Sequence, residues 1–424
     1  MAPNGGGRSS LALALSPRES TAFDRWALTL VRDGVAGARL RFALWDGFEL
    51  PCDGPPVGTL TLKTRRALLG WAWDPDLNFG EAYMSGEAEV DGDLVAVLEE
   101  AYRALRGTRA RSSWWRAAND LARAKANVHS HYDLGNAFYR LWLDREMVYT
   151  CAYFPTAECS LEEAQVAKMD LVCRKLGVNA GDHVVEAGCG WGALALHMAR
   201  EYGAIVRAFN VSKEQIAFAR ERAAREGLAG RVEFIEDDYR NMSGAFDVFV
   251  SVGMLEHVGL PDYPTFGDVI HRTLKPNGRA LLHFIGRNQP KMLNAWVQKR
   301  IFPGAYPPTL AEAFLGVLEP HGFSVLDVEN LRLHYALTLR HWLERFERST
   351  RAIETMFDAR FVRAWRLYLA GSQASFTTGA MQLFQVVLAR GESNAIPWVR
   401  YGQDGQDRRD GREGQDGREE CVGR

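Results

Sequence analysis

Hydrophobic positions between residues 127 and 400 follow an alternating plan. Short runs with strand character are separated by segments of helical length and period. The strand-like runs are HVVEAG, AIVRAFN, RVEFIE, FDVFVSVG, RALLHFIG and FSVLDVEN, which begin at His183, Ala204, Arg231, Phe246, Arg279 and Phe323. Alternation of strands and helices predicts an α/β domain with a largely parallel, doubly wound sheet. A last run, FQVVLAR at 384–390, predicts one more strand, which we expect to close the sheet edge.

The chain before this domain has a different pattern. RFALWDGFEL at 41–50 alternates as a strand does, TLTLKT at 59–64 repeats the alternation, and DLVAVLEEAYRALR at 93–106 has the period of an amphipathic helix. These runs predict a smaller N-terminal α+β domain over 21–106. Residues 1–20, rich in Gly and Ser, and the polar repeat over 401–424 are expected to be disordered.

A basic, aromatic segment over 107–126 joins the two domains. It holds one acid, Asp120, against Arg109, Arg111, Arg116, Arg123 and Lys125, with Trp114 and Trp115 among them. Such a segment can dock on anionic lipid headgroups with its indoles at the interface. The alternative is a solvated linker helix whose tryptophans cover a neighbouring domain. Neither interpretation requires nucleic acid.

Composition narrows the class of protein. The 424 residues are 47% hydrophobic and 25% charged, as in globular proteins, and the net charge of −2 argues against a nucleic-acid-binding protein. The six cysteines are scattered without a CxxC pair or zinc spacing, so we expect reduced thiols in a cytoplasm and no metal site. No apolar run is long enough for a membrane span.

A glycine turn follows the first strand of the predicted sheet. Gly188, Gly190 and Gly192 lie between the strand and a helix, where glycine lets the backbone adopt φ above zero and approach a ligand. The spacing E-x-G-x-G-x-G differs from the dinucleotide pattern G-x-G-x-x-G. Asn210 also stands where a nicotinamide-dinucleotide site has an acidic ribose ligand.

The turn instead resembles the cofactor loop of S-adenosylmethionine-dependent methyltransferases. This resemblance implies that Glu186 orients the loop and the amino-acid end of the cofactor. It also implies that Asp237 and Asp238, after a later strand, lie near the adenine. The alternative is a structural turn without a ligand.

Two further stretches make the resemblance specific. HSHYDLGNAFYRLWLDREMVYTCAYF at 129–154 and SVGMLEHVG at 251–259, with LLHFIG at 281–286, resemble the cyclopropane-fatty-acyl-phospholipid synthase family. That family includes mycolic acid cyclopropane synthases and fatty-acid methyltransferases. The resemblance covers roughly 125–400 and implies a doubly wound class I S-adenosylmethionine methyltransferase sheet for the catalytic domain, 127–400. GEAYMSGEAEVDGDL at 80–94 resembles the accessory domain of long family members, which engages lipid.

The chemistry implied by this resemblance suits the residues present. The substrate is a carbon–carbon double bond, a weak nucleophile, so the sulfonium methyl group must be held close and in line. Methyl transfer leaves a carbocation that aromatic faces stabilise, and a base then removes a proton from the new methyl group so that the ring closes. In the family the base is a bound bicarbonate ion. Its ligands, matched by motif, are Cys151, Glu256, His283, Tyr335 and the backbone of Ile285.

Each side chain of this set also has a structural interpretation when taken alone. Cys151 is then a buried thiol, His283 a core histidine and Tyr335 a packed ring. Their joint occurrence in the family's motifs favours the ion site. Glu256, a carboxylate beside an anion, is expected to accept the proton of the bicarbonate.

The resemblance also implies a set of cofactor residues. They are Tyr132, Tyr149, Thr150, Glu186, Gly188, Gly190, Gly192, Asn210, Gln215 and Asp238. Trp191 packs either on the cofactor or into the core. Thr150, Asn210 and Glu186 stand where the family usually has Ser, Thr and Asp, and each keeps the relevant polar group. Leu367, Ser372 and Phe384 replace Tyr, Cys and Trp, and are expected to reshape the acyl tunnel.

The predicted function is methyl transfer from S-adenosylmethionine to the double bond of unsaturated phospholipid acyl chains, which forms a cyclopropane fatty acid. The alternative is a methylene- or methyl-branched product, which a partner reductase would saturate.

A small-molecule N-methyltransferase would not need the bicarbonate set, and the intact glycine turn disfavours a lipid-binding protein without activity. We expect a cytoplasmic protein, peripheral to the inner face of the membrane, with a homodimer left open.

Overall fold

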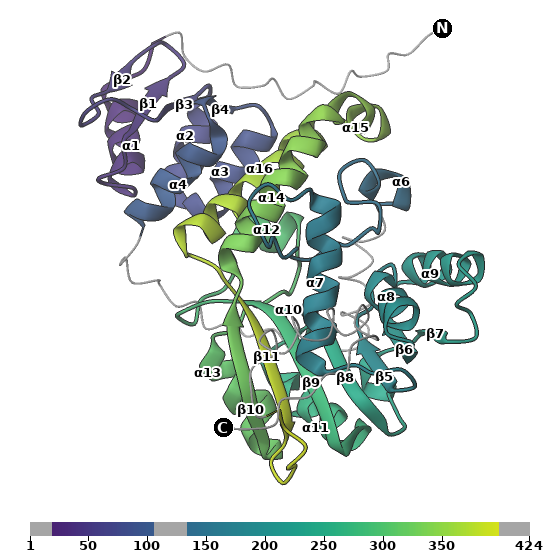
Figure 1. Cartoon of the computed structure of the whole chain (residues 1–424). Helices are drawn as coiled ribbons and strands as arrows, with labels where there is room; N and C mark the ends of the chain where they lie inside the picture. The colour runs from purple at the N-terminus through teal and green to yellow at the C-terminus, as the bar shows by residue number, and fades with distance from the viewer. Residues whose placement is uncertain (1–18, 106–133, 398–424) are drawn as a thin grey trace, which may run out of the picture.

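The structure is a computed structural model that describes residues 19–105 and 134–397 (Figure 1). Two sheets organise these residues, a small one near the N-terminus and a larger one formed by the rest of the chain. The predictions for Tyr132, for the basic segment 107–126 and for the tail 401–424 concern residues outside the described ranges.

The N-terminal unit is a four-stranded sheet covered by helices. Its strand order is β2-β1-β3-β4, with β1 and β3 parallel and the outer pairs antiparallel. The strands are β1 (Leu40–Leu44), β2 (Glu49–Leu50), β3 (Gly58–Leu62) and β4 (Ala88–Gly92). The helices are α1 (Ala22–Asp33), α2 (Arg65–Trp73), α3 (Pro75–Met84) and α4 (Leu94–Ala104).

Two sequence predictions for this unit need correction. The single strand expected over 41–50 is a hairpin of β1 and β2, because the turn between them includes Gly47 at a φ of +86°. The disorder expected over 1–20 does not reach its last residue. Ser20 is buried and its amide donates to Asp46 Oδ2 at 2.7 Å.

The larger unit holds a seven-stranded sheet in the order β10-β11-β9-β8-β5-β6-β7. Its strands are β5 (His183–Ala187), β6 (Ile205–Asn210), β7 (Val232–Glu236), β8 (Phe246–Val252), β9 (Leu274–Gly286), β10 (Phe323–Asn330) and β11 (Gln382–Arg390). All six predicted strand runs are confirmed. The expected place of FQVVLAR is wrong: β11 lies inside the sheet, antiparallel to β9 and β10. Eight of the nine residues of β11 are buried, whereas only one of the eight residues of the edge strand β10 is buried.

Helices α7 and α8 pack on one face of this sheet and α11 packs on the other. The helices of the larger unit are α6 (Asn136–Tyr139), α7 (Leu161–Leu176), α8 (Ala193–Glu201), α9 (Lys213–Arg225), α10 (Leu255–Val258), α11 (Tyr263–Thr273), α12 (Ala295–Arg300), α13 (Leu310–Ala313), α14 (Arg332–Arg348), α15 (Thr350–Met356) and α16 (Ala359–Thr378). Side chains alternate between the faces along each strand. Val184 therefore packs with α7 and α8, while Val185 packs with α11.

The two units meet in one apolar cluster, beside the separate core of the N-terminal unit. Tyr83 and Met84 of α3 belong to the same buried cluster as Trp365 of α16. The two helices α3 and α16 lie side by side (Figure 1). Gly80 allows this approach, because a Cβ there would lie 2.3 Å from Cγ of Trp296. Arg363 of α16 donates to the carbonyl oxygens of Tyr83 at 2.5 Å and Ala88 at 3.0 Å. The N-terminal unit is thus packed firmly against the helices above the large sheet.

Candidate active site

The glycine turn lies at the carboxyl end of β5, in the middle of the parallel sheet. Gly188, Gly190 and Gly192 have φ values of +82°, +53° and +83°, which glycine adopts without steric cost. A Cβ on Gly192 would lie 2.5 Å from Cζ of Phe234, so this glycine serves helix packing. A Cβ on Gly190 would meet nothing within 4 Å. Gly190 therefore faces open space, as a ligand-binding turn requires.

That open space is a cavity of about 180 Å³ at the carboxyl ends of β5, β6, β7 and β8. The predicted cofactor residues that line it are Tyr149, Thr150, Glu186, Gly188, Gly190, Asn210, Gln215 and Asp238. Gly192 does not line it. Ligands of doubly wound folds bind at this position, outside the carboxyl ends of the strands.

The polar atoms around this cavity fit the amino-acid and ribose parts of S-adenosylmethionine. Glu186 Oε2 and Gln215 Nε2 are buried and have no hydrogen-bond partner. Asn210 Nδ2 donates to Gln215 Oε1 at 2.7 Å, which holds the Gln215 amide in place. A buried acceptor and a buried donor without partners are costly unless a ligand completes them. The structure therefore supplies binding groups for a polar ligand on this turn.

Lys168 is a residue of this cavity that the sequence analysis missed. Its side chain lies on the buried face of α7, and Nζ donates to Thr150 Oγ1 at 3.1 Å. Burial lowers the pKa of Lys168 to about 8. Burial also raises the pKa of Glu186 to about 7, and the charge of Lys168 opposes that rise. The lysine thus favours the ionised form of the carboxylate beside the glycine turn.

A second, larger cavity of about 1420 Å³ adjoins the first. Both cavities are lined by Tyr149, Thr150, Gly253 and His257. Apolar side chains such as Leu339, Phe376 and Leu383 contribute to the wall of the larger cavity, which extends to the N-terminal unit. A group bound on the glycine turn therefore lies next to an extended space suited to an apolar chain.

The five residues predicted to hold bicarbonate all line this larger cavity. Glu256, on α10, accepts the amide hydrogen of Ile285 with Oε1, while its Oε2 is buried without a partner. Burial raises the pKa of Glu256 to about 7. The Ile285 amide is thus engaged by Glu256, so in this arrangement it orients the carboxylate.

His283 presents the second unpartnered group. Its Nε2 is buried without a hydrogen-bond partner, and burial lowers the pKa of its ring to about 3. The Cys151 thiol is buried and donates to the carbonyl oxygen of Ala152 at 3.0 Å, and burial raises its pKa. Tyr335 packs its ring 4.6 Å from that of Phe376. The carboxyl group of Glu256, a neutral imidazole, a thiol and a phenol thus line one cavity.

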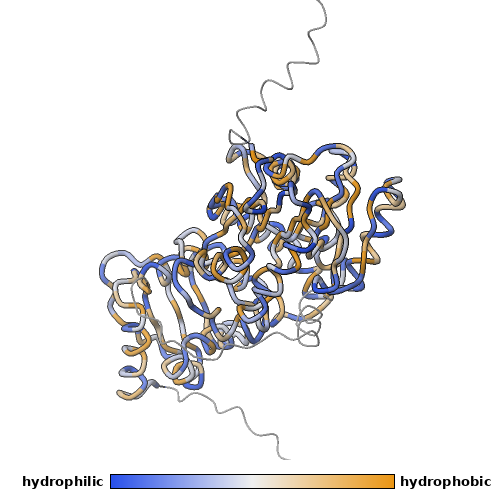
Figure 2. Tube along the Cα trace, turned by 90° about the horizontal axis from the view of Figure 1, so that it is seen from below, coloured by the Kyte–Doolittle hydropathy of each residue, from blue (hydrophilic) through white to orange (hydrophobic). Residues whose placement is uncertain are grey.

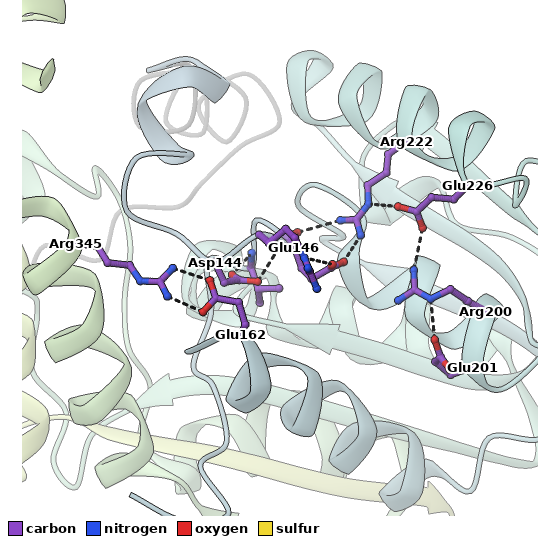
Figure 3. A network of polar contacts seen from close by, with 10 residues as sticks. Asp144, Glu146, Glu162, Arg200, Glu201, Arg222, Glu226 and Arg345 are labelled. Atoms are coloured by element: carbon purple, nitrogen blue, oxygen red, sulfur yellow. Dashed lines mark hydrogen bonds and ion pairs between the residues drawn. The ribbon is translucent and has the colours of Figure 1, made fainter. Parts of the chain in front are cut away.

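A network of ion pairs fixes the segment that leads to Cys151 (Figure 3). Arg345 of α14 binds Glu162 at 2.6 and 2.8 Å and the carbonyl oxygen of Leu143 at 3.0 Å. On the other side, Arg222 of α9 pairs with Glu146 and with Glu226, the latter at 2.6 Å. The segment 143–151 is therefore anchored to helices at both of its sides.

The chain matches the family model described as mycolic acid cyclopropane synthetase over residues 119–386. It belongs to this family. Residues 36–112 match a second family model, described as a domain of unknown function. The family assignment thus rests on the larger unit, whereas most of the N-terminal unit matches a separate family model.

Relatives and solved structures agree with this assignment. The chain is 37% identical to a tuberculostearic acid methyltransferase of Mycobacterium tuberculosis, over 89% of this chain and 95% of that protein. It is also 37% identical to the cyclopropane-fatty-acyl-phospholipid synthase of Escherichia coli, over 76% and 85%. The mycolic acid cyclopropane synthase CmaA1, solved with S-adenosylhomocysteine, superposes with a TM-score of 0.59 at 29% identity, over 62% of this chain and 97% of that one. The seven-stranded unit has the class I S-adenosylmethionine methyltransferase fold.

Two of the three residues expected to reshape the acyl tunnel, Leu367 and Ser372 of α16, line the larger cavity. Phe384, the third, is buried on β11, where its ring lies 5.8 Å from that of Phe284 on β9. Of these three, only the α16 residues are therefore placed to change the shape of the larger cavity.

Trp191 lines the cofactor cavity and also belongs to the core, with its Nε1 donating to Asn136 Oδ1 at 2.6 Å.

Proposed function

We propose that this protein transfers a methyl group from S-adenosylmethionine to the double bond of an unsaturated phospholipid acyl chain and forms a cyclopropane fatty acid. One observation carries the proposal: the cofactor cavity and the large apolar cavity meet at Tyr149, Thr150, Gly253 and His257. A weak nucleophile such as an alkene reacts only when it is held next to the methyl donor. The shared wall provides that proximity.

The residues of the smaller cavity have distinct roles in this proposal. Glu186 and Gln215 bind the polar amino-acid and ribose groups, Gly190 leaves room for them, and Asp238 lies at the adenine end. When bound, S-adenosylmethionine supplies an electrophilic methyl group. Lys168 favours the ionised form of the Glu186 carboxylate, because its positive charge opposes the effect of burial on the pKa of that group.

Bicarbonate is the proposed base, held by the groups of the larger cavity. Neutral His283 donates a hydrogen bond from Nε2 to an oxygen of the ion, and Glu256 Oε2 accepts the proton that the ion carries. The thiol of Cys151 and the phenol of Tyr335 are the remaining side-chain groups of the proposed ion site. An ion held in this way can accept a proton from the methylated chain without the carboxylate of Glu256 touching the substrate.

The second candidate product is a methylene- or methyl-branched chain. The similarity to a tuberculostearic acid methyltransferase favours it as strongly as the similarity to the Escherichia coli synthase favours the cyclopropane. Both products begin with the same methyl transfer, and they differ in the carbon that then loses a proton. A methylene-branched product would require a reductase as a partner.

We also propose that the protein works at the inner face of the membrane as a peripheral protein. No helix among the described residues is long and apolar enough to cross a bilayer, and hydrophobic residues are spread along the chain rather than gathered in one segment (Figure 2). Helix α1 instead exposes an apolar stripe, in which Phe23, Trp26 and Leu30 keep 55%, 56% and 45% of their surface accessible. Leu30 also lines the large cavity. The stripe is therefore continuous with the space proposed for the acyl chain.

The test is mass spectrometry of fatty-acid methyl esters after incubation with S-adenosylmethionine and vesicles of unsaturated phospholipid. Half of each sample is hydrogenated under mild conditions. A gain of one CH2 in a chain that takes up no hydrogen supports the cyclopropane product. The same gain with hydrogen uptake supports the branched alternative. No gain by a protein that binds S-adenosylhomocysteine in calorimetry contradicts lipid methylation.

A further inference from the structure

Arg287 lies in the large cavity and has no assigned role. It follows β9 directly, and side chains alternate along an extended chain, so His283, Ile285 and Arg287 share one face. All three line the cavity. The backbone of Arg287 is fixed, because its amide donates to the carbonyl oxygen of Pro308 at 2.9 Å. Four residues of extended chain place it roughly 13 Å from His283.

One nitrogen of the Arg287 guanidinium is left without a hydrogen bond. Its Nε is buried and has no hydrogen-bond partner among the described residues. Burial lowers the pKa of Arg287, and interactions with Tyr102, Tyr306 and Asp76 oppose that change. The hydroxyl of Tyr306 is already used, since it donates to Glu312 Oε1 at 2.9 Å. A charged donor that is buried without a partner is costly, and an anionic ligand would remove that cost.

The surroundings of Arg287 are those of a polar headgroup rather than an acyl chain. Tyr102, on α4 of the N-terminal unit, lines the same cavity. Burial raises the pKa of Tyr102, so its phenol is a neutral donor. The loop after Arg287 adds Asn288, Gln289 and Lys291 to the cavity wall. Arg287 and the residues after it thus add donors and positive charge to the cavity wall beside the single acid Asp76, whereas Leu339, Phe376 and Leu383 add apolar surface.

We propose that Arg287, assisted by Tyr102, binds the phosphodiester of the phospholipid whose acyl chain is methylated. The inference rests on the proposed function and adds the substrate class that this site recognises. A guanidinium forms paired hydrogen bonds with phosphate oxygens, and Lys291 supplies a second positive charge. The cavity of about 1420 Å³ exceeds the roughly 300–1,000 Å³ typical of small-ligand pockets and leaves room for a diacyl lipid. Anchoring the headgroup at Arg287 would fix which carbons of the chain reach His283.

The test compares lipids that share acyl chains and differ at the headgroup. Dioleoyl phosphatidylglycerol, dioleoylglycerol and oleic acid are presented in the same non-ionic micelles to the wild type and to Arg287→Gln. We expect the variant to lose tenfold or more of kcat/KM on the phospholipid and none on dioleoylglycerol, with Arg287→Lys between the two. Arg348→Gln is the matched control, because this arginine is 75% exposed on α14 and does not line the cavity.

A binding measurement separates this inference from the proposed function. Calorimetry with dihexanoyl phosphatidylglycerol, which has no double bond, should show weaker binding to Arg287→Gln than to the wild type, with S-adenosylhomocysteine affinity unchanged. That result would support the phosphate site even if no lipid were methylated. Equal losses on phospholipid and dioleoylglycerol would overturn it and make Arg287 a structural residue. A loss confined to oleic acid would overturn it in favour of a carboxylate site.

Discussion

Gln385 on β11 pairs directly with His283 on β9, and Gln385 Nε2 lies 3.0 Å from His283 Nδ1. With the amide donating, Nδ1 is the acceptor, and the hydrogen of the neutral ring is on Nε2. That nitrogen is the one left without a partner in the wall of the large cavity. One buried amide thus selects which nitrogen of His283 can donate to an anion.

Gln385→Leu should therefore lower turnover through His283. Leucine keeps the volume but frees the ring to take the other tautomer, and the loss of such outer hydrogen bonds to histidine typically costs about ten- to a hundredfold. Affinity for S-adenosylhomocysteine should stay unchanged, because Gln385 does not line the cofactor cavity. Initial rates in a double-mutant cycle with His283→Ala are the measurement. The positioning role is wrong if Gln385→Leu costs the same in both backgrounds.

Glu256→Gln and Cys151→Ser should reduce turnover far more than cofactor binding. Both side chains line the large cavity and not the cofactor cavity, and their proposed task is to hold the base. Loss of general-base chemistry typically costs about a hundred- to ten-thousandfold. Initial rates and calorimetry with S-adenosylhomocysteine measure the two effects separately. Wild-type turnover in either variant would refute the ion site.

The same Glu256→Gln variant should be more stable than the wild type at alkaline pH. Burial raises the pKa of Glu256 from 4.5 to about 7, so folding takes up a proton between these values. The contribution of Glu256 to stability is then complete below pH 4.5 and is lost as pH rises through 7. Relative to the wild type, the variant should gain up to about 3 kcal/mol across this window, at about 1.4 kcal/mol per unit. Urea unfolding at several pH values is the measurement, and a constant difference would contradict the buried ionisation.

Lys168→Met should weaken cofactor binding in a pH-dependent way. Without the lysine, the pKa of Glu186 rises from about 7 to a higher value, so its carboxyl is mostly neutral near physiological pH. We expect affinity for S-adenosylhomocysteine to fall about tenfold at neutral pH and to recover in alkaline buffer, as one unit of pKa corresponds to a tenfold change. Lys168→Arg is the matched control, since it keeps the positive charge beside Glu186 and leaves the cofactor residue Thr150 in place. A loss that does not change with pH would make Lys168 a packing residue only.

Lys168 also shows why the sequence could not supply the whole site. The strands, the glycine turn and the motifs around Cys151, Glu256 and His283 are local patterns, and local patterns can be found in a chain without its structure. A lysine in a helix is ordinarily interpreted as solvent-exposed. Its role here depends on the hydrogen bond from Lys168 on α7 to Thr150. That contact forms only when the chain folds, so no local pattern indicates it. Its position in the buried stripe with Ala164 and Val172 was the available signal.

The misplaced strand has a related cause. FQVVLAR, the last strand-like run of the chain, was expected at the sheet edge, but order in the chain does not fix order in a sheet. Its nearly continuous apolar run is typical of a strand buried on both faces. The alternating polar residues of FSVLDVEN, by contrast, indicate the exposed edge that β10 occupies. The residue composition of the two runs would have placed β11 inside the sheet and β10 at its edge, whereas their order in the chain did not.

Vesicle binding distinguishes two candidate membrane contacts, the apolar stripe of α1 and the basic segment 107–126. Phe23, Trp26 and Leu30 recur along one face of α1, and removing one large exposed side chain from a membrane interface should weaken binding by about tenfold or more. Trp26→Ser should do so in co-sedimentation with phosphatidylglycerol vesicles, with little dependence on salt, because the contact is apolar. Leu315→Ser, which alters a residue 62% exposed on the larger unit, is the control and should bind as the wild type does.

Replacement of Arg109, Arg111 and Arg116 by Gln tests the basic segment outside the described residues. Its effect should be largest at low salt and vanish at high salt, since added salt screens charges separated by more than about 10 Å. The α1 stripe and the basic segment thus predict different responses to salt in the same assay, a constant effect for Trp26→Ser and one that fades with added salt for the arginine variant. A Trp26→Ser variant that binds vesicles as tightly as the wild type, beside a salt-sensitive arginine variant, would move the membrane contact from α1 to the basic segment. The reverse pattern would leave that segment as a linker and α1 as the membrane contact.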